Sequence, residues 1–218
     1  MFKPIRWNTF VRDFFVIQVG FFLYGLAISL AIQANLGTGT WAVFEVAVAK
    51  LAGVSVGTIT MIDGFVVLTI VLALREKIGW GTLGNILSIG PWLNQCLKFI
   101  PSIEGNFPVQ LVMLLAAVLT MGIASAVYIG VDAGAGPRDS LMLAIHRTTK
   151  LSLRMARGSV ELIVFIIGGL LGGPVGIGTA IFVFLIGPSV QWAFKLFNVQ
   201  PHKAEENESI PAAAFTED

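Results

Sequence analysis

Charge is scarce in this sequence. Only 12% of its 218 residues are Asp, Glu, Lys or Arg, whereas 56% are hydrophobic. Soluble domains carry about 25% charged residues. Long apolar runs follow one another with few interruptions, so the composition predicts membrane helices rather than the core of a soluble domain.

Thiols and imidazoles are equally scarce. Cys96 is the only cysteine, which excludes an internal disulfide and a thiolate metal cluster, and the two histidines, His146 and His202, do not complete a zinc site with it. The sequence also lacks a nucleophile–base arrangement, a phosphate-binding loop and a basic, aromatic-rich patch. We therefore expect no enzyme activity, no cofactor, no metal and no nucleic-acid partner.

The apolar runs predict an all-α, polytopic transmembrane bundle. The first run lacks a signal-peptide cleavage site, so it is interpreted as a span. The predicted spans are residues 14–34, 57–74, 82–98, 108–130, 158–172 and 175–197. Two further helical segments, 40–52 and 137–149, are only ~20 Å long, too short to cross a ~30 Å hydrocarbon layer. We interpret them as re-entrant or interfacial half-helices; the alternative is that they lie flat on the membrane surface.

The chain contains an internal repeat. Residues 14–99 align without a gap on residues 111–196, a shift of 97 positions. Three glycine-containing blocks fix this register: Gly37-Thr38-Gly39 on Gly134-Ala135-Gly136, Gly79-Trp80-Gly81-Thr82 on Gly176-Ile177-Gly178-Thr179, and Ile89-Gly90-Pro91 on Ile186-Gly187-Pro188. Three crossings per repeat predict inverted topology, which suits alternating access around a midplane site. The alternative is a duplication kept for packing, without transport.

The distribution of lysine and arginine predicts the orientation. If the N-terminus is cytoplasmic, twelve of the 14 basic residues lie on the cytoplasmic side, and only Lys50 and Lys98 lie outside. We therefore expect a multi-pass protein of the bacterial inner membrane with both termini cytoplasmic. The predicted segments are a basic N-terminus (1–13), a first repeat (14–99), an extracytoplasmic connection (100–110), a second repeat (111–197) and a disordered acidic tail (198–218).

The two Gly-x-Gly turns are candidate substrate-binding elements. Glycine permits positive φ, and a half-helix that begins inside the protein directs its free N–H groups and its dipole toward an anion. The candidate binding residues on and after the turns are Asn35, Gly37, Gly39, Asp132, Gly134, Gly136, Arg138 and Asp139. The alternatives are that the glycines only turn the chain and allow close packing, and that Arg138 and Asp139 form an interfacial ion pair.

Polar residues within the apolar segments are a second candidate set. Asp63, Glu161 and Asn85 fall inside predicted spans, where ionisable groups usually face a cavity or a partner, and the two acids are candidates for proton coupling. The alternative is placement near the membrane surface. Pro91 and Pro188 predict kinked helices at equivalent positions that could act as gates.

The glycine motifs resemble a known family. LGTGTWAVFEVAVAKLAGVSVGTITMIDG followed by GWGTLGNILSIGPWL resembles the YczE/YitT-like family of bacterial integral membrane proteins. The matching residues are Leu36, Gly37, Gly39, Trp41, Gly53, Gly57, Thr58, Gly79, Gly81 and Thr82. Thr40 replaces the proline of the family pattern, which the second repeat keeps as Pro137. The resemblance spans most of residues 14–197 and implies the fold and a membrane location, but no substrate.

These features favour a small secondary transporter or flippase. Its substrate would be an anionic or zwitterionic small molecule or lipid held between the Gly-x-Gly elements. The alternative function is a non-transporting membrane protein that regulates or scaffolds a partner. We expect the lipid bilayer as an environment, and a monomer of this length is small for a complete pathway, which favours a homodimer.

Overall fold

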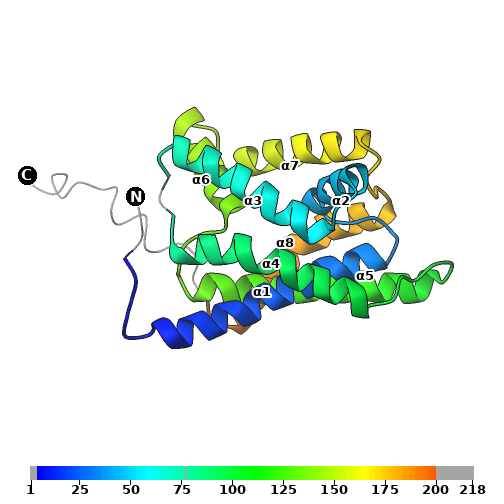
Figure 1. Cartoon of the computed structure of the whole chain (residues 1–218), viewed down its shortest axis with the longest axis horizontal. Helices are drawn as coiled ribbons and strands as arrows, with labels where there is room; N and C mark the ends of the chain where they lie inside the picture. The colour runs from blue at the N-terminus through cyan, green and yellow to red at the C-terminus, as the bar shows by residue number, and fades with distance from the viewer. Residues whose placement is uncertain (1–3, 77, 200–218) are drawn as a thin grey trace, which may run out of the picture.

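Eight α-helices form the described part of the protein, which confirms the predicted all-α fold (Figure 1). The computed structural model describes residues 4–76 and 78–199; most of the predicted acidic tail lies outside these residues. The helices are α1 (Phe10–Gln33), α2 (Thr40–Ala52), α3 (Val56–Ala73), α4 (Trp80–Phe99), α5 (Phe107–Gly130), α6 (Pro137–Thr149), α7 (Leu153–Leu170) and α8 (Ile177–Leu196).

The two half-helices α2 and α6 have the bounds that the sequence predicts, 13 residues each. The turns that precede them contain Gly37 at φ 100° and Gly134 at φ 113°, a backbone conformation that side chains with a Cβ rarely adopt. Each half-helix ends at a left-handed residue, Gly53 at φ 68° and Lys150 at φ 57°. The positive-φ residues on both sides therefore set the length of each half-helix.

Both half-helices pack inside the bundle. α2 and α6 each contact α3 and α7, so the four helices form one group. Each half-helix has a buried face: Ala42, Val43, Glu45, Ala47 and Ala49 in α2, and Pro137, Ser140, Leu141, Met142 and Ala144 in α6. This packing favours the re-entrant interpretation over helices that lie flat on the membrane surface.

Four of the eight described helices are long and apolar enough to cross a membrane: α1, α3, α5 and α8. The other two predicted spans are also helices, α4 with 20 residues and α7 with 18. α7 begins earlier than predicted, and its first half carries Arg154, Arg157 and Glu161. Pro91 and Pro188 lie inside α4 and α8. Six crossings remain the prediction of the charge pattern, with α4 and α7 as the more polar pair.

The equivalent helices α1 and α5 cross antiparallel at the centre of the other group. The Tyr24 hydroxyl lies 2.7 Å from the Ser125 hydroxyl, the Phe21 and Tyr128 rings are 5.2 Å apart, and further along the Ile103 N–H donates to the Gln33 carbonyl. α4 packs on α1 in the same way as α8 packs on α5. Gly25 of α1 contacts α4, and its equivalent Gly122 of α5, 97 positions later, contacts α8. Glycine allows both close approaches.

Each Gly-x-Gly turn docks on the other repeat. The Gly178 N–H donates to the Leu36 carbonyl at 2.6 Å, and the Gly81 N–H donates to the Ala133 carbonyl at 3.0 Å. These two bonds are the same contact, because Gly81 and Gly178, like Leu36 and Ala133, are 97 positions apart. Reciprocal contacts of this kind are what a two-fold relation between two halves produces. The last helix of each repeat, α4 or α8, thus holds the Gly-x-Gly turn of the other repeat.

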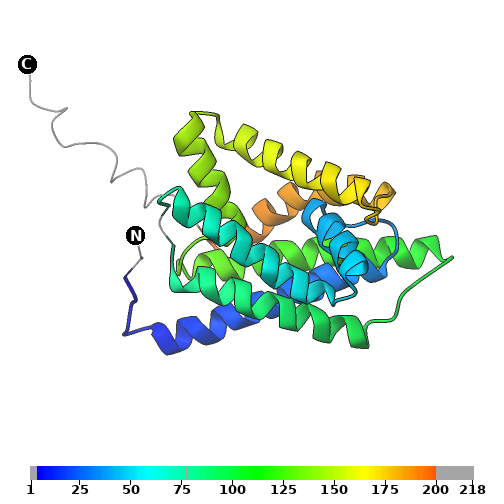
Figure 2. The same cartoon turned by 45° about the horizontal axis from the view of Figure 1, so that its top comes forward.

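The bundle has two distinct ends (Figures 1 and 2). α1 begins, and α5 and α8 end, at one of them: Arg6 donates to the Val131 carbonyl, and Val199 lies beside Gly130. We call this the basic end, because α6 finishes and α7 begins there with Arg147 and Arg154. The opposite end holds the α4–α5 connection and the end of α2, near Lys98 and Lys50. Under the charge rule the basic end is the predicted cytoplasmic end.

Candidate functional site

Three charged side chains meet where the two half-helices begin. The Arg138 guanidinium, one residue into α6, donates to Asp63 Oδ2 of α3 at 2.9 Å and also to Glu45 Oε1 of α2. The Glu45 side chain is 0% exposed, Asp63 is 9% exposed and Arg138 is 27% exposed. We call these three residues the ion cluster. Asp63 lies near the middle of its helix, so the cluster sits deep within the bundle.

Trp41 completes the surroundings of Arg138. The guanidinium carbon lies 4.3 Å from the centroid of the Trp41 ring, a cation–π geometry. Trp41 and Arg138 are themselves equivalent residues, 97 positions apart. Two equivalent residues that contact each other lie close to the pseudo-two-fold axis that relates the repeats. The starts of α2 and α6 therefore meet at the centre of the molecule.

The charges of the ion cluster do not cancel by themselves. One guanidinium faces two carboxylates, a formal excess of one negative charge. Each helix N-terminus contributes the equivalent of about +0.5 charge, and the starts of α2 and α6 both lie here. The helix ends thus offset the second carboxylate. Both bonds come from Nη2, so Nε and Nη1 of Arg138 make no hydrogen bond to a described residue, and an anion that binds them would share the guanidinium with two carboxylates.

A second polar group surrounds Gly136, at the very start of α6. A Cβ built on Gly136 would lie 3.5 Å from Asn85 Nδ2, 3.5 Å from Asp139 Oδ2 and 3.7 Å from the Tyr128 hydroxyl. We call Asn85, Tyr128 and Asp139 the Gly136 cluster. Tyr128 donates to the Gly134 carbonyl at 2.9 Å, whereas the Asn85 amide makes no hydrogen bond to another described residue. Three of the predicted site residues, Asn85, Gly136 and Asp139, are thereby brought together.

Further charges reach this cluster from α7. Arg157 Nε donates to Glu161 Oε1 at 2.9 Å, four residues along the helix. Asp139 interacts electrostatically with Arg157, Glu161 and Arg138. Glu161, a predicted coupling residue, is thus paired within its own helix and lies 27% exposed, close to the Gly136 cluster rather than to Asp63.

Several buried polar atoms around the half-helix starts have unused hydrogen-bonding capacity. Among the described residues, Trp41 Nε1, Glu45 Oε2 and Ser140 Oγ are buried without a hydrogen-bond partner. Thr60 lies close to the Glu45 carboxyl. Most buried polar atoms in proteins are paired, so a concentration of exceptions on the first two turns of α2 and α6 marks these turns as a candidate binding surface.

Three of the predicted turn glycines have packing roles. A Cβ on Gly37 would lie 2.6 Å from the Gly176 nitrogen, and one on Gly39 would lie 2.8 Å from the Phe182 ring. A Cβ on Gly134 would lie 2.7 Å from the Gly79 backbone. For these residues the structure fits the alternative of close packing, and it leaves Gly136 as the turn glycine that faces polar side chains.

Asn35 and Asp132 do not approach the ion cluster or each other. Both take a left-handed backbone conformation, with φ 52° and 55°, two positions after the last residues of α1 and α5. The Asn35 amide donates to Ser102 Oγ at 2.5 Å and to the Ile103 carbonyl at 3.2 Å, at the opposite end. Asp132 is exposed at the basic end. Asn35 and Asp132 therefore do not line one site between the two turns, because each residue shapes the chain reversal after its own helix.

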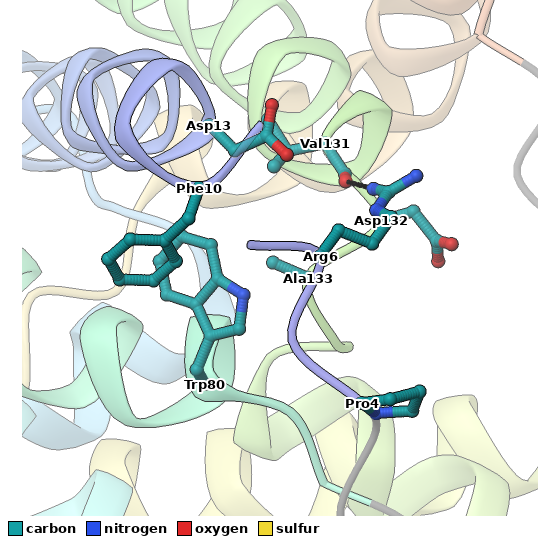
Figure 3. A pocket seen from close by; sticks show the side chains of 8 residues that line it. All are labelled: Pro4, Arg6, Phe10, Asp13, Trp80, Val131, Asp132 and Ala133. Atoms are coloured by element: carbon teal, nitrogen blue, oxygen red, sulfur yellow. Dashed lines mark hydrogen bonds between the residues drawn. The ribbon is translucent and has the colours of Figure 1, made fainter. Parts of the chain in front are cut away.

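A small cavity adjoins Asp132 (Figure 3). It lies between the N-terminal segment and the starts of α1 and α4, and Arg6 spans it to reach the Val131 carbonyl. The Phe10 and Trp80 rings meet edge to face beside it at 5.2 Å. These contacts fasten the N-terminal segment to the end of α5, and the cavity lies apart from the ion cluster.

Sequence reasoning missed four residues of the site. Glu45 and Trp41 become important only through contact with Arg138, 93 and 97 positions later. Tyr24 interacts electrostatically with Asp139 and so belongs to the surroundings of the Gly136 cluster. It and Tyr128 are the only tyrosines of the chain, and both lie in otherwise apolar runs. A hydroxyl inside a span is a signal for an internal polar partner, and it was available in the sequence.

Comparison with known proteins identifies the family. Residues 11–195 match the Family of unknown function (DUF6198). The chain belongs to this family. The chain is similar to an "Uncharacterized protein" of Haemophilus influenzae, 29% identical over 196 residues, which cover 90% of this chain and 89% of that protein.

Two proteins of Bacillus subtilis are also similar to this DUF6198 chain. "Uncharacterized membrane protein YczE" is 26% identical over 185 residues, covering 84% of this chain and 82% of the relative. "Uncharacterized protein YyaS" is 25% identical over 174 residues, covering 78% and 86%. No solved structure matches the chain. The predicted resemblance to YczE-like proteins is confirmed, and with four helices suited to a membrane the chain is an integral membrane protein.

Proposed function

We propose that this protein is a small secondary transporter that couples a polar solute to protons. The observation that carries the proposal is the ion cluster of Glu45, Asp63 and Arg138 at the point where two half-helices begin. Ionisable groups at membrane depth are costly and are usually found where ions or substrates pass. Half-helix starts at the interface of two repeats are the typical binding sites of secondary transporters.

The charges favour a zwitterionic substrate that carries an amine. Carboxylates outnumber guanidinium groups around the half-helix starts, and Asp139 accepts no hydrogen bond from a described residue. An ammonium group fits beside Asp139, while the acidic group of the same solute fits the donors on Arg138 and Asn85. A purely anionic solute would meet Asp63, Glu45 and Asp139 without an ammonium group to offset them, so the surplus of carboxylates favours the zwitterion among the predicted substrates.

Proton binding at Asp63 would control how strongly Arg138 holds the substrate carboxylate. When a proton from solution neutralises Asp63, the Arg138–Asp63 ion pair becomes an ordinary hydrogen bond and Arg138 can turn toward a substrate carboxylate. Loss of the proton restores the ion pair and releases the substrate. Glu45, fully buried, keeps Arg138 anchored in both states. In this mechanism Asp63 exchanges the proton and Glu45 is a positioning residue.

Proton influx into proteoliposomes that contain a pH-sensitive dye tests this proposal. The external additions are zwitterionic amino acids and betaines in one series and monocarboxylates in the other. We expect influx with the zwitterions, its loss in Asp63→Asn, and its retention in Glu104→Gln, a change at an exposed loop residue. Absence of flux with both series, or unchanged flux in a folded Asp63→Asn variant, would overturn the proposal.

A further inference from the structure

The two repeats differ in one pair of helices. In the first repeat, α3 packs along α4, whereas the equivalent helices α7 and α8 make almost no contact. Each pair is a hairpin joined by a short loop, at the basic end for α3–α4 and at the opposite end for α7–α8 (Figure 2). Away from its loop, the first hairpin stays packed, so the start of α3 contacts α4. In the second hairpin the start of α7 is separated from α8.

A compact contact closes the first hairpin at the opposite end. The Gly57 N–H donates to Asn94 Oδ1 at 2.9 Å, and the Asn94 amide donates to Ser55 Oγ at 2.8 Å. Gly57 and Gly90 touch through their backbones, since a Cβ on either would collide with the carbonyl oxygen of the other. We call Ser55, Gly57, Gly90 and Asn94 the α3–α4 clasp.

The second repeat keeps only part of this clasp. The equivalents of its four residues are Ser152, Arg154, Gly187 and Gln191. Gly187 has nothing within 4 Å of the place where its Cβ would lie, so the contact is absent there. Arg154 also brings a Cβ to the position where Gly57 needs none, which prevents α7 from approaching α8 as closely as α3 approaches α4.

The equivalent faces of α3 and α7 also differ: the α3 face carries small residues and the α7 face carries charged residues. On α3 the face consists of Gly57, Thr60 and Gly64, and Thr60 is 8% exposed. The equivalent face of α7 consists of Arg154, Arg157 and Glu161, with Arg157 57% exposed and Glu161 27% exposed. Small residues on α3 allow tight packing, whereas charged residues on α7 need water or polar partners. The sequence thus specifies one sealed hairpin and one open hairpin.

We infer that the ground state of this protein is open at the basic end, through the space between α7 and α8, and sealed at the opposite end by the α3–α4 clasp. This inference rests on the proposed function and specifies the side from which the site is reached. Arg157 and Glu161 lie on the α7 face equivalent to the packed face of α3, and both interact electrostatically with Asp139 of the Gly136 cluster. Under the charge rule, the entrance is cytoplasmic.

Cross-linking of matched cysteine pairs tests the inference in a Cys96→Ala background. Ser55→Cys with Asn94→Cys replaces two clasp residues in contact, and Ser152→Cys with Gln191→Cys is the equivalent pair of the open hairpin. With a short bifunctional methanethiosulfonate we expect the first pair to cross-link and the second pair not to cross-link. Equal cross-linking of both pairs in the purified full-length protein would overturn the inference.

Water accessibility provides a second measurement that leaves the clasp intact. The probe is a membrane-impermeant, charged methanethiosulfonate added to one side of oriented vesicles. Arg157→Cys should react from the basic end only, and its equivalent Thr60→Cys should react from neither end. Reaction of Thr60→Cys from the opposite end as fast as Arg157→Cys reacts would contradict a sealed α3–α4 hairpin.

The two proposals fail in different ways. A transporter that rests open at the opposite end would give solute-driven proton flux with the reversed labelling pattern, which refutes only this inference. The expected labelling and cross-linking without flux for either solute series would refute the proposed function and leave the open and sealed hairpins as a property of the fold.

Discussion

Replacement of Arg138 by methionine removes the positive charge on which two carboxylates depend. Methionine has a similar length and no charge, so the packing against Trp41 is largely kept while the ion pairs are lost. Glu45 is fully buried and Asp63 nearly so, and Arg138 is the cation that pairs with both. The variant therefore leaves both acids to be accommodated without a counter-charge.

The expected cost follows from this burial. Removal of one partner of a buried ion pair destabilises proteins by about 3–5 kcal/mol. Arg138 is 27% exposed, so water already weakens the pair, and we expect the lower value of about 3 kcal/mol for Arg138→Met. Glu45→Gln alone should cost less, since it leaves Arg138 paired one-to-one with Asp63.

A double-mutant cycle measures the coupling between Arg138 and Glu45. Stability is measured as the free energy of unfolding by SDS in detergent micelles for the parent, Arg138→Met, Glu45→Gln and the double variant. In the Arg138→Met background Glu45→Gln should be stabilising, with a coupling energy of at least about 1 kcal/mol. Additive effects of the two substitutions would show that these side chains do not form a pair, and the account of the ion cluster would be refuted.

Three further predictions use equivalent positions as controls. Gly90→Ala should destabilise the protein by about 1–3 kcal/mol because a methyl group there meets the α3 backbone; Gly187→Ala has open space and should be neutral or slightly stabilising in the same unfolding assay. Thr82→Val removes a hydroxyl that donates to the Ala135 carbonyl of the second turn at 2.6 Å, so it should lower the free energy of unfolding by about 1–3 kcal/mol. The Thr179 hydroxyl only accepts a bond from the Gly176 N–H at its own helix start, so Thr179→Val should cost less, and equal losses would contradict this. Asn85→Leu should leave unfolding unchanged, since Asn85 has no hydrogen bond to a described residue, but should abolish solute-driven proton flux; retained flux would remove Asn85 from the site.

The half-helices show what local sequence determines. Their bounds follow from positive-φ glycines before them and from a short helical pattern that is too short to cross a membrane. Such signals act within a few residues and can be read without the fold. The same locality explains the error about Asn35 and Asp132: both are polar residues at helix ends, where a left-handed residue reverses the chain, and this role needs no ligand.

The pairing of Glu45 with Arg138 could not be predicted in this way. The repeat register places Met142, not Arg138, opposite Glu45, so the contact breaks the internal symmetry. It depends on how the two half-helix starts approach each other, which the packing of whole helices decides. The asymmetry of the hairpins, in contrast, was readable: under the 97-residue shift, Gly57 and Gly64 on α3 correspond to the charged Arg154 and Glu161 on α7.

The central claim is that the two repeats are inverted relative to each other in the membrane, so that their half-helices enter from opposite sides. Val54→Cys and Leu151→Cys test it most directly, because these residues occupy equivalent positions just after α2 and α6. In a Cys96→Ala background, an impermeant maleimide added to intact cells should label position 54 and spare position 151, and in inside-out vesicles the pattern should reverse. Labelling of both positions from the same side would contradict the inverted arrangement and the central site that depends on it.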